Sequence, residues 1–432
     1  MQKEDILKIL KAWNLWDHEI DSGIQRNLYV DRITSLINEK AINVVIETGI
    51  RRSGKSFIAK QVARKLVEEH LPRRKILIIN LEDERLIERN YDVLLQMYET
   101  YKEVVNSNEK SVIIIDEAQE AEGWERFVRG LSERGEARFI ITGSSSKLLD
   151  SEFSTLLSGR HVVVYVHPLN LYELKKFTGK HDGLIQYLEG GGFPAIVLSK
   201  LKADLVSSYF NTIILKDVIQ RFRIQKQDNL IRLAKFYITS IGSRVTFNSI
   251  SKFLNLSVKT VYNFSLYLEK SYLIFFISRF TFSIKTQDNS PRKVYSIDNS
   301  FPFYLGINPV EIRGRLLENA VATTLYLVSR HRPEFRFYYW NENNKEVDFI
   351  IKNKQQYEAV QVAYSVTAEK TRLREVTGLL DCCRRLNLSI GEIVTLDYTG
   401  EELVDNISVK YVSANDWIEG KLKEYGLSTA PR

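Results

Sequence analysis

Cysteine is nearly absent from this sequence. Its 432 residues include two cysteines, Cys382 and Cys383, which are adjacent and therefore poor partners for an ordinary disulfide bond. Such sparse cysteine is typical of a reducing compartment, so we expect a cytoplasmic protein without a disulfide framework. The six histidines are scattered and show no H-x₃-H or similar spacing, which argues against a structural zinc site.

Long hydrophobic runs are also missing. The longest, such as residues 272–277, are far too short to span a bilayer, and the first residues contain no apolar signal region. Acidic tails, low-complexity tracts and repeats are not evident. We therefore expect no membrane partner.

The composition is that of an ordinary globular protein, with 44% hydrophobic and 27% charged residues. A chain of 432 residues is too long for one hydrophobic core, so we expect about two to four domains. The formal net charge of +7 permits contact with nucleic acid without demonstrating it.

Residues 47–56 read Glu-Thr-Gly-Ile-Arg-Arg-Ser-Gly-Lys-Ser and match the phosphate-loop pattern G-x-x-x-x-G-K-[ST]. A buried strand is predicted before the loop, at 42–47, and a helix after it, at 57–67. The glycines let backbone N–H groups turn inward into an anion-binding nest at the helix N-terminus. Lys55 would reach the β- and γ-phosphates of a nucleotide, and the Ser56 hydroxyl would ligate Mg²⁺. The alternative is a glycine-rich turn that matches by chance. The residues predicted to bind the nucleotide are Gly49, Arg51, Arg52, Ser53, Gly54, Lys55, Ser56 and Phe57.

A second motif follows about sixty residues later. Residues 110–117 run from an apolar strand into Asp116 and Glu117, as expected for a central parallel strand that ends at a metal site. Asp116 would hold Mg²⁺, directly or through water, and Glu117 would polarise the attacking water. Alternatively, the two acids cap a helix predicted at residues 118–122.

Polar residues end the next predicted strand, at 137–146. Thr142, Ser144 and Ser145 lie where ligands bind beyond the carboxyl ends of parallel strands. Ser144 is the favoured contact to the γ-phosphate and the attacking water. It is equally well explained as the N-cap of a helix at 146–157.

Arg160 precedes a strand predicted at 161–166. It is a candidate arginine finger that would reach the γ-phosphate of a neighbouring subunit, which would imply an oligomer. The alternative is a surface arginine near a helix C-terminus.

In this order, the motifs resemble those of a large prokaryotic family of AAA+-type ATPases with a C-terminal domain of unknown function. The family pattern is Gly-x-Arg-x-x-Gly-Lys-Ser/Thr, Asp-Glu-x-Gln, Thr-Gly-Ser-Ser and Gly-Arg. It corresponds here to residues 49–56, 116–119, 142–145 and 159–160. The resemblance covers nearly the whole chain. It implies an AAA+-like fold, ATP hydrolysis with Mg²⁺ and, at 168–229, a helical lid over the nucleotide, but it supplies no biological role.

The pattern of residues 230–290 predicts amphipathic helices followed by a strand. This order is typical of a winged helix-turn-helix module. Positions 243 to 293 contain eight basic residues and two acidic ones, and this surplus of positive charge favours phosphate contact. The basic residues are Arg244, Lys252, Lys259, Lys270, Arg279, Lys285, Arg292 and Lys293. The second helix of the motif would present Ser257, Lys259, Thr260 and Asn263 to double-stranded DNA. The alternative is a protein–protein spacer.

The pattern from residue 291 onward is α+β. A predicted helix carries Glu318, a predicted hairpin carries Asp348, and the next strand carries Gln361. This order resembles the PD-(D/E)xK nuclease fold, in which such residues hold Mg²⁺ and activate water. The nuclease lysine falls on Ala363, so we expect a retained fold that binds or docks rather than cleaves. Glu346 is the nearest extra acid.

The sequence therefore predicts an α/β fold: a P-loop AAA+-like parallel sheet, a helical lid, a winged helix-turn-helix and a C-terminal α+β restriction-endonuclease-like domain. The expected boundaries are a helical lead-in at 1–40, the ATPase core at 41–167, the lid at 168–229, the winged helix at 230–290 and the nuclease-like domain at 291–432. The main hypothesis is Mg²⁺-dependent ATP binding and hydrolysis that drives conformational change, coupled to DNA binding or remodelling. Two alternatives stay open: a slow ATP-dependent switch that binds a protein partner, and an ATP-regulated nuclease.

Overall fold

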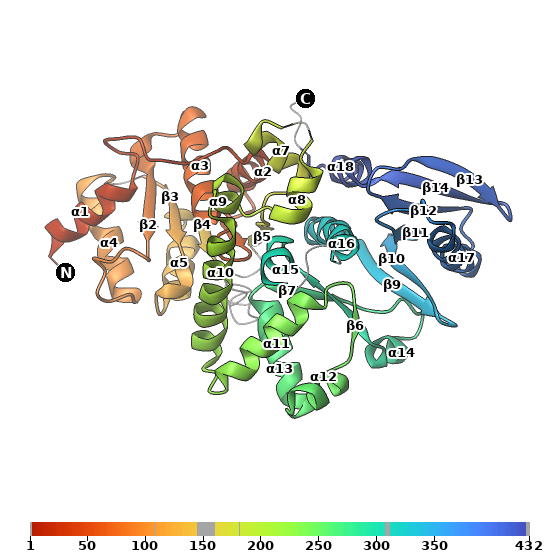
Figure 1. Ribbon diagram of the computed structural model, residues 1–432. Helices are drawn as coiled ribbons and strands as arrows, with labels where there is room; N and C mark the ends of the chain where they lie inside the picture. The colour runs from red at the N-terminus through yellow and green to blue at the C-terminus, as the bar shows by residue number, and fades with distance from the viewer. Residues whose placement is uncertain (1, 108, 145–159, 181, 307–311, 429–432) are drawn as a thin grey trace. The chain divides into compact units, whose positions relative to one another are not determined.

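The structure is a computed structural model that describes residues 2–107, 109–144, 160–180, 182–306 and 312–428. The chain divides into two compact units, Met1–His167 and Pro168–Arg432. Figure 1 shows the helices and strands of both units.

The first unit is built on a five-stranded parallel sheet with the order β2-β3-β4-β1-β5. Its strands are buried runs of β-branched and other apolar residues, as expected when helices cover both faces of a parallel sheet. The strands are β1 (Val44–Thr48), β2 (Ile76–Asn80), β3 (Ser111–Asp116), β4 (Ala137–Gly143) and β5 (His161–Tyr165). The α-helices described in this unit are α1 (Lys3–Trp13), α2 (Asn27–Asn38), α3 (Lys55–Glu68), α4 (Tyr91–Val104) and α5 (Trp124–Glu133). The strands predicted at 42–47, 110–117, 137–146 and 161–166 are thus confirmed, with small differences at their ends.

The N-terminal segment covers the free edge of this sheet. Asn14, which follows α1, donates from Nδ2 to the carbonyl of Ile78 at 2.8 Å and accepts at Oδ1 from the N–H of Ile78 at 2.7 Å. The indole of Trp16 donates to the carbonyl of Ile76 at 2.8 Å. Side chains thereby pair with backbone groups of edge strand β2 that would otherwise be open to another strand. The predicted helical lead-in is therefore part of the packing of this unit.

The second unit begins with helices and continues into two sheets. Its first part contains α7 (Leu171–Thr178), α8 (Leu184–Gly190), α9 (Pro194–Leu198) and α10 (Lys202–Thr212), and α10 runs into a π-helical segment at Ile213–Gln220. A three-stranded antiparallel sheet follows, with the order β6-β8-β7. Its strands and neighbouring helices are α11 (Gln227–Thr239), β6 (Arg244–Val245), α12 (Phe247–Leu254), α13 (Val258–Lys270), β7 (Ile274–Ile277), α14 (Ile284–Asn289) and β8 (Arg292–Ser296).

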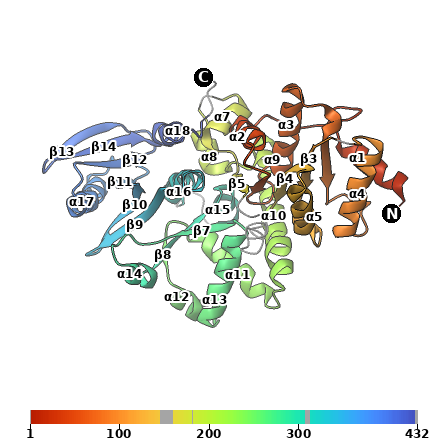
Figure 2. The same cartoon turned by 180° about the vertical axis from the view of Figure 1, so that it is seen from behind.

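The C-terminal part of this unit is a mixed six-stranded sheet with the order β13-β14-β12-β11-β10-β9 (Figure 2). Strands β9 to β11 are antiparallel, as predicted for the hairpin, whereas β11, β12 and β14 are parallel. The elements are α15 (Ser300–Leu305), α16 (Arg313–His331), β9 (Phe335–Glu342), β10 (Lys345–Asn353), β11 (Gln356–Val362), α17 (Glu369–Leu386), β12 (Ile390–Thr395), β13 (Gly400–Val404), β14 (Ile407–Ser413) and α18 (Ala414–Glu424). Helix α17 packs on β10, β11 and β12, and its apolar face includes both cysteines, which are buried free thiols.

Candidate functional site

The phosphate loop connects β1 to α3 and lies next to the carboxyl ends of β3 and β4. Because the sheet order is β3-β4-β1, these three strand ends are neighbours. Gly49 has φ 150°, and a Cβ at this position would lie 2.1 Å from the Val166 carbonyl oxygen, so no larger residue fits. Gly54 has φ 99° and precedes the first residue of α3, a left-handed conformation that favours glycine. The glycines of the motif are thus required by the backbone itself.

Lys55 begins helix α3 and is buried, with 3% of its surface exposed. Its ammonium group donates to the carbonyls of Gly49 and Ile50 at 3.1 and 3.0 Å. The charge is therefore held inside the curve of the loop, where a phosphate group of a nucleotide would lie in a loop of this kind.

Ser56, Asp116 and Thr142 form a hydrogen-bonded group across α3, β3 and β4. The Ser56 hydroxyl donates to Asp116 Oδ1 at 2.9 Å, and the Thr142 hydroxyl donates to the same oxygen at 2.5 Å. Burial, followed by the charge of Glu117, raises the pKa of the Asp116 carboxyl to about 6. A cation beside such a carboxylate would stabilise its ionised form. Mg²⁺ commonly binds one or two protein oxygens together with the phosphates of a nucleotide. Ser56 and Asp116 therefore fit a magnesium ion that is shared with a nucleotide.

Glu117 has a different environment from its neighbour. Its backbone is left-handed, with φ 54°, and its N–H donates to the Thr142 hydroxyl at 3.1 Å. Gln119 and Ser144 donate to Glu117 Oε2, Ser144 at 3.4 Å. Burial favours the neutral acid, but the charges of Lys55 and Arg51 outweigh it and hold the pKa of Glu117 below its ordinary value. The adjacent carboxyls are thus tuned in opposite directions, as in sites where two acids have different tasks.

The remaining predicted loop residues differ in exposure. Arg51 is buried and pairs with Glu82 at 3.1 Å, whereas Arg52 is exposed and has φ 69°. The Ser53 hydroxyl is buried without a hydrogen-bond partner among the described residues. Phe57 is 43% exposed, so its ring is open to solvent rather than packed in the core.

Arg160 does not join this group. It lies directly before β5, and its carbonyl accepts from the N–H groups of Asn43 and Val44 at 3.1 and 3.3 Å. Because β1 and β5 are parallel, Arg160 is at the amino end of the sheet, opposite the phosphate loop. The Arg160 backbone therefore lies on the opposite side of the sheet from the phosphate loop of the same chain. Ser145, Gly159 and the helix predicted at 146–157 lie outside the described residues.

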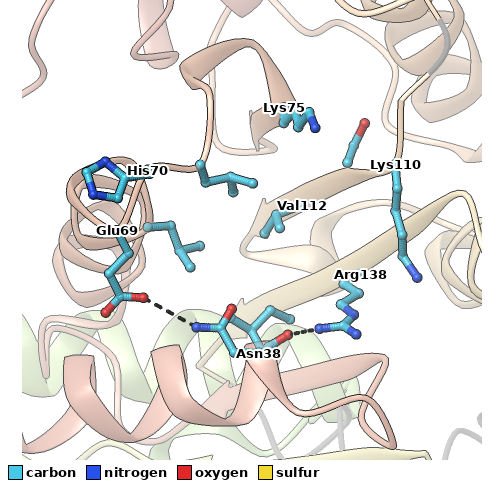
Figure 3. A pocket seen from close by; sticks show the side chains of 11 residues that line it. Asn38, Glu69, His70, Lys75, Lys110, Val112 and Arg138 are labelled. Carbon is cyan, nitrogen blue, oxygen red and sulfur yellow. Dashed lines mark hydrogen bonds between the residues drawn. The ribbon is translucent and has the colours of Figure 1, made fainter.

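A pocket of about 410 Å³ also lies at the amino ends of the strands, away from the phosphate loop (Figure 3). Lys75, Lys110 and Arg138 line it together with Glu69. Lys75 pairs with Glu109 at 2.7 Å, and Arg138 donates to the carbonyl of Ile37. None of the predicted site residues lines this pocket.

Two buried charged residues beside the loop escaped the sequence analysis. Arg26 donates to the carbonyls of Ser53 and His167 at 2.6 and 3.0 Å and so ties the loop to the end of the unit. Glu47 is fully buried in β1, and neither carboxyl oxygen has a hydrogen-bond partner among the described residues. A carboxylate inside an otherwise apolar strand was a signal for Glu47, whereas nothing near Arg26 distinguishes it from other arginines.

Glu47→Gln is expected to stabilise the protein more at pH 8 than at pH 5. Burial, followed by the charge of Asp116, raises the pKa of Glu47 well above 4.5. The folded state therefore holds this proton more tightly than the unfolded state, and stability falls as pH rises above the unfolded pKa. The neutral amide removes that loss, so the gain in stability of the variant over wild type is larger at pH 8 than at pH 5. Thermal unfolding at both pH values measures it, with exposed Glu39→Gln as the control. Equal shifts at the two pH values would contradict the prediction.

The nuclease-like residues do converge, in the second unit. Glu318 lies on α16, Asp348 on β10 and Gln361 on β11. The Asp348 N–H donates to Gln361 Oε1 at 3.1 Å, and Gln361 Nε2 donates to Glu375 at 2.7 Å. Ala363 stands where the nuclease pattern has a lysine, but a lysine from another strand lies beside the acids: Lys293 of β8 donates to Glu318 and Asp348 at 3.0 and 2.8 Å. The sequence analysis missed this lysine and Glu375.

The same contacts correct the predicted basic surplus at 243–293. Lys293 is buried among carboxylates, and Arg244 pairs with Glu346 at 3.2 Å. The positive charges of these two side chains are therefore already paired with carboxylates and are less available to bind DNA phosphates. Lys259 is exposed. The Ser257 hydroxyl caps the start of α13 by accepting from the N–H of Thr260 at 3.1 Å, and the hydroxyl oxygens of these two residues lie 2.8 Å apart. Asn263 is partly exposed on the same helix.

The first unit is a P-loop domain: a parallel sheet whose phosphate loop, serine and strand-end carboxylates meet at one edge. A comparison with known families agrees with this assignment. Residues 41–175 match the model of a family described as an AAA domain. Together, the sheet and this match support a P-loop AAA+ family for this part of the chain.

The rest of the chain matches families without an assigned role. Residues 181–310 match a domain of unknown function, DUF8612, and residues 313–413 match another, DUF4143. An uncharacterized protein of Methanocaldococcus jannaschii, MJ1544, is 29% identical over 95% of this chain and 92% of its own length. An uncharacterized protein of Haemophilus influenzae is 26% identical over 91% of this chain and 98% of its own length.

Solved structures with partial similarity include DNA-bound Orc1 of Aeropyrum pernix, with a TM-score of 0.33 and 13% identity over 72% of this chain and 98% of that chain. AMPPCP-bound DnaA of Aquifex aeolicus has a TM-score of 0.30 and 12% identity over 60% of this chain and 92% of that chain. Scores of this size do not define a common fold for the whole chain. None of the described helices is long and apolar enough to cross a membrane.

Proposed function

We propose that the first unit binds ATP with Mg²⁺ and hydrolyses it. The observation that carries this proposal is the hydrogen bond from Ser56 to Asp116 at 2.9 Å, beside the buried ammonium of Lys55. It brings together a hydroxyl, a carboxylate and a cation, the groups that bind magnesium and the β- and γ-phosphates in P-loop enzymes. Loop residues 49–57, including the Ser53 hydroxyl, which has no hydrogen-bond partner in the part of the chain that the structure describes, would complete the contacts to the nucleotide.

The division of roles follows from the two acids. Asp116 would support the magnesium ion, and bound magnesium supplies Lewis-acid stabilisation of phosphate charge. Glu117, whose pKa is lowered, stays ionised near neutral pH and orients or deprotonates the attacking water, with Ser144 holding its carboxylate. Arg160 would act on the γ-phosphate of a neighbouring subunit, because in its own subunit it lies at the amino ends of the strands, opposite the phosphate loop.

Lys55→Ala tests this proposal. The variant is expected to lose detectable binding of Mg·ATP and to release phosphate at the rate of a protein-free control. Calorimetry measures binding and a phosphate-release assay measures turnover. Lys65→Ala is the matched control, since Lys65 lies on the same helix and pairs with Asp31 rather than with the loop. Wild-type binding and turnover in Lys55→Ala would refute the assignment.

DNA coupling is the second part of the proposed function. Helices α12 and α13 are joined through Asn255, which has φ 54°; β6 precedes them, β7 and β8 follow them, and the three strands form a sheet with the order β6-β8-β7. Helix pairs followed by such a small sheet are typical of winged helix-turn-helix modules, which place the second helix in the major groove. Lys252, Lys259 and Lys285 are exposed on this part of the chain and would contact phosphates. ATP hydrolysis would then drive a conformational change of the DNA-bound protein.

Lys259→Ala is expected to weaken duplex DNA binding similarly for all sequences and to lower the salt slope by about 1. Fluorescence anisotropy across a salt series, with and without ATP, measures both effects. Lys200→Ala is the control, because Lys200 is exposed outside the helix pair. Absence of wild-type binding at low salt would favour the other candidate, an ATP-dependent switch that binds a protein partner.

A further inference from the structure

Lys293 is the centre of a buried charged cluster in the second unit, independent of the nucleotide site. Its ammonium lies 3.0 Å from Glu318 Oε1, 2.7 Å from Glu346 Oε1 and 2.8 Å from Asp348 Oδ1. The lysine comes from β8 of the small sheet, and the acids come from α16 and from β10 of the large sheet. We call Lys293, Glu318, Glu346 and Asp348 the Lys293 cluster.

The ammonium is paired on three sides. It donates hydrogen bonds to Glu318 and Asp348 and forms an ion pair with Glu346. Lys293 is 1% exposed. Burial alone would lower the pKa of its amine, but the acids, Asp348 first, keep that pKa well above its ordinary value, so the group is charged. A buried charge this well paired is stable only while its partners stay in place.

The three acids have further partners. Asp348 Oδ2 accepts from the N–H of Val362 at 3.0 Å, and Glu346 Oε2 forms an ion pair with Arg244 at 3.2 Å. Glu318 Oε1 also accepts from the Tyr295 hydroxyl at 2.6 Å. In the part of the chain that the structure describes, no three His, Cys, Asp or Glu side chains are arranged to hold a metal ion.

The Lys293 ammonium lies between the three carboxylates, within 3.0 Å of one oxygen of each, so it neutralises the negative charge that would otherwise attract a divalent cation. A calcium ion takes oxygen ligands at about 2.3–2.6 Å, only slightly closer than the oxygens around Lys293 Nζ. A metal ion added beside the ammonium would meet a like charge at close range in a site with little water to screen it. Metal and ammonium therefore exclude each other.

We propose that Lys293 is a built-in cation that takes the place of the divalent metal in a nuclease-like set of carboxylates. The C-terminal sheet consequently does not work as a metal-dependent nuclease. The cluster instead joins the small sheet to the large one, so that the helix pair α12–α13 and the C-terminal sheet move together.

Lys293→Met tests this inference, since methionine keeps the length of the side chain and removes the charge. Calcium titrations by calorimetry, in nucleotide-free protein, are expected to show one additional Ca²⁺ site in the variant, bound at least tenfold more tightly than any site of this unit in wild type. The double variant Lys293→Met/Glu346→Gln is expected to lose that site. Calcium should also raise the unfolding temperature of Lys293→Met alone. A folded Lys293→Met that gains no Ca²⁺ site would overturn the proposal.

A second measurement does not depend on the folding of that variant. Glu346 is the most exposed acid of the cluster, with 30% of its side chain exposed. Wild type and Glu346→Gln are expected to give the same Ca²⁺ and Mn²⁺ isotherms and to leave supercoiled plasmid uncut with Mg²⁺ or Mn²⁺. Loss of a metal site in Glu346→Gln, or plasmid cleavage by wild type that this variant abolishes, would show that a metal binds beside Lys293.

Discussion

Glu117→Gln is expected to release phosphate from ATP about 10²–10³-fold more slowly than wild type while it binds Mg·ATP with nearly unchanged affinity. The amide keeps the shape of the side chain and an oxygen that can accept from Ser144, as the carboxylate does at 3.4 Å. It loses the negative charge that Lys55 and Arg51 preserve against burial by holding the pKa of Glu117 low. Only the hydrolysis step, which needs a base or a negatively charged side chain beside the attacking water, should therefore become slower.

The comparison that isolates this role uses equilibrium binding and single-turnover hydrolysis side by side. Glu120→Gln, three residues further on and exposed, makes the same chemical change outside the site and should leave both quantities unchanged. If Glu117→Gln hydrolysed ATP at the wild-type rate, Glu117 would not act on water. If it lost nucleotide binding instead, Glu117 would belong to the metal or phosphate contacts together with Asp116.

The arrangement around the phosphate loop was predictable because its signals are local. The phosphate loop, its strand and its helix are contiguous in sequence, and Asp116 and Glu117 follow a run of buried residues. Parallel strands then bring their carboxyl ends together, and there Ser56 and Thr142 both donate to Asp116. Arg26 lacks such a pattern, since contacts across the unit place it, whereas the signal for Glu47 was a carboxylate inside an otherwise apolar strand.

The Lys293 cluster shows why the rest could not be predicted. A motif search expects the lysine two residues after Gln361, on the same strand. The structure supplies it from β8, 25 residues before Glu318 and 55 residues before Asp348. Because strand residues alternate between faces, Lys293 points inward while Arg292 beside it is partly exposed. A count of basic residues treats the two alike and so overstates the charge available to DNA.

Asp348→Ala is expected to lower the free energy of unfolding of the second unit by about 3–5 kcal/mol in the absence of any added metal. Removal of this carboxylate deprives the buried Lys293 ammonium of a partner at 2.8 Å and the Val362 N–H of its acceptor at 3.0 Å. The opening should be local to β10 and β11, where native-state hydrogen exchange of residues 345–362 measures it. Asp381→Ala is the matched control, because Asp381 forms a more exposed pair with Lys345 and should cost about 1 kcal/mol or less.

A double-mutant cycle then separates a charge pair from ordinary packing. Combined with Lys293→Met, the Asp348→Ala change should cost about 1–3 kcal/mol less than it does alone, since the unpaired ammonium is gone. Additive effects would mean that Asp348 stabilises the sheet without Lys293. A variant of full stability that lost only metal-dependent cleavage would assign Asp348 to catalysis instead. The cycle thus decides whether this carboxylate set serves to hold two sheets together or to hold a metal.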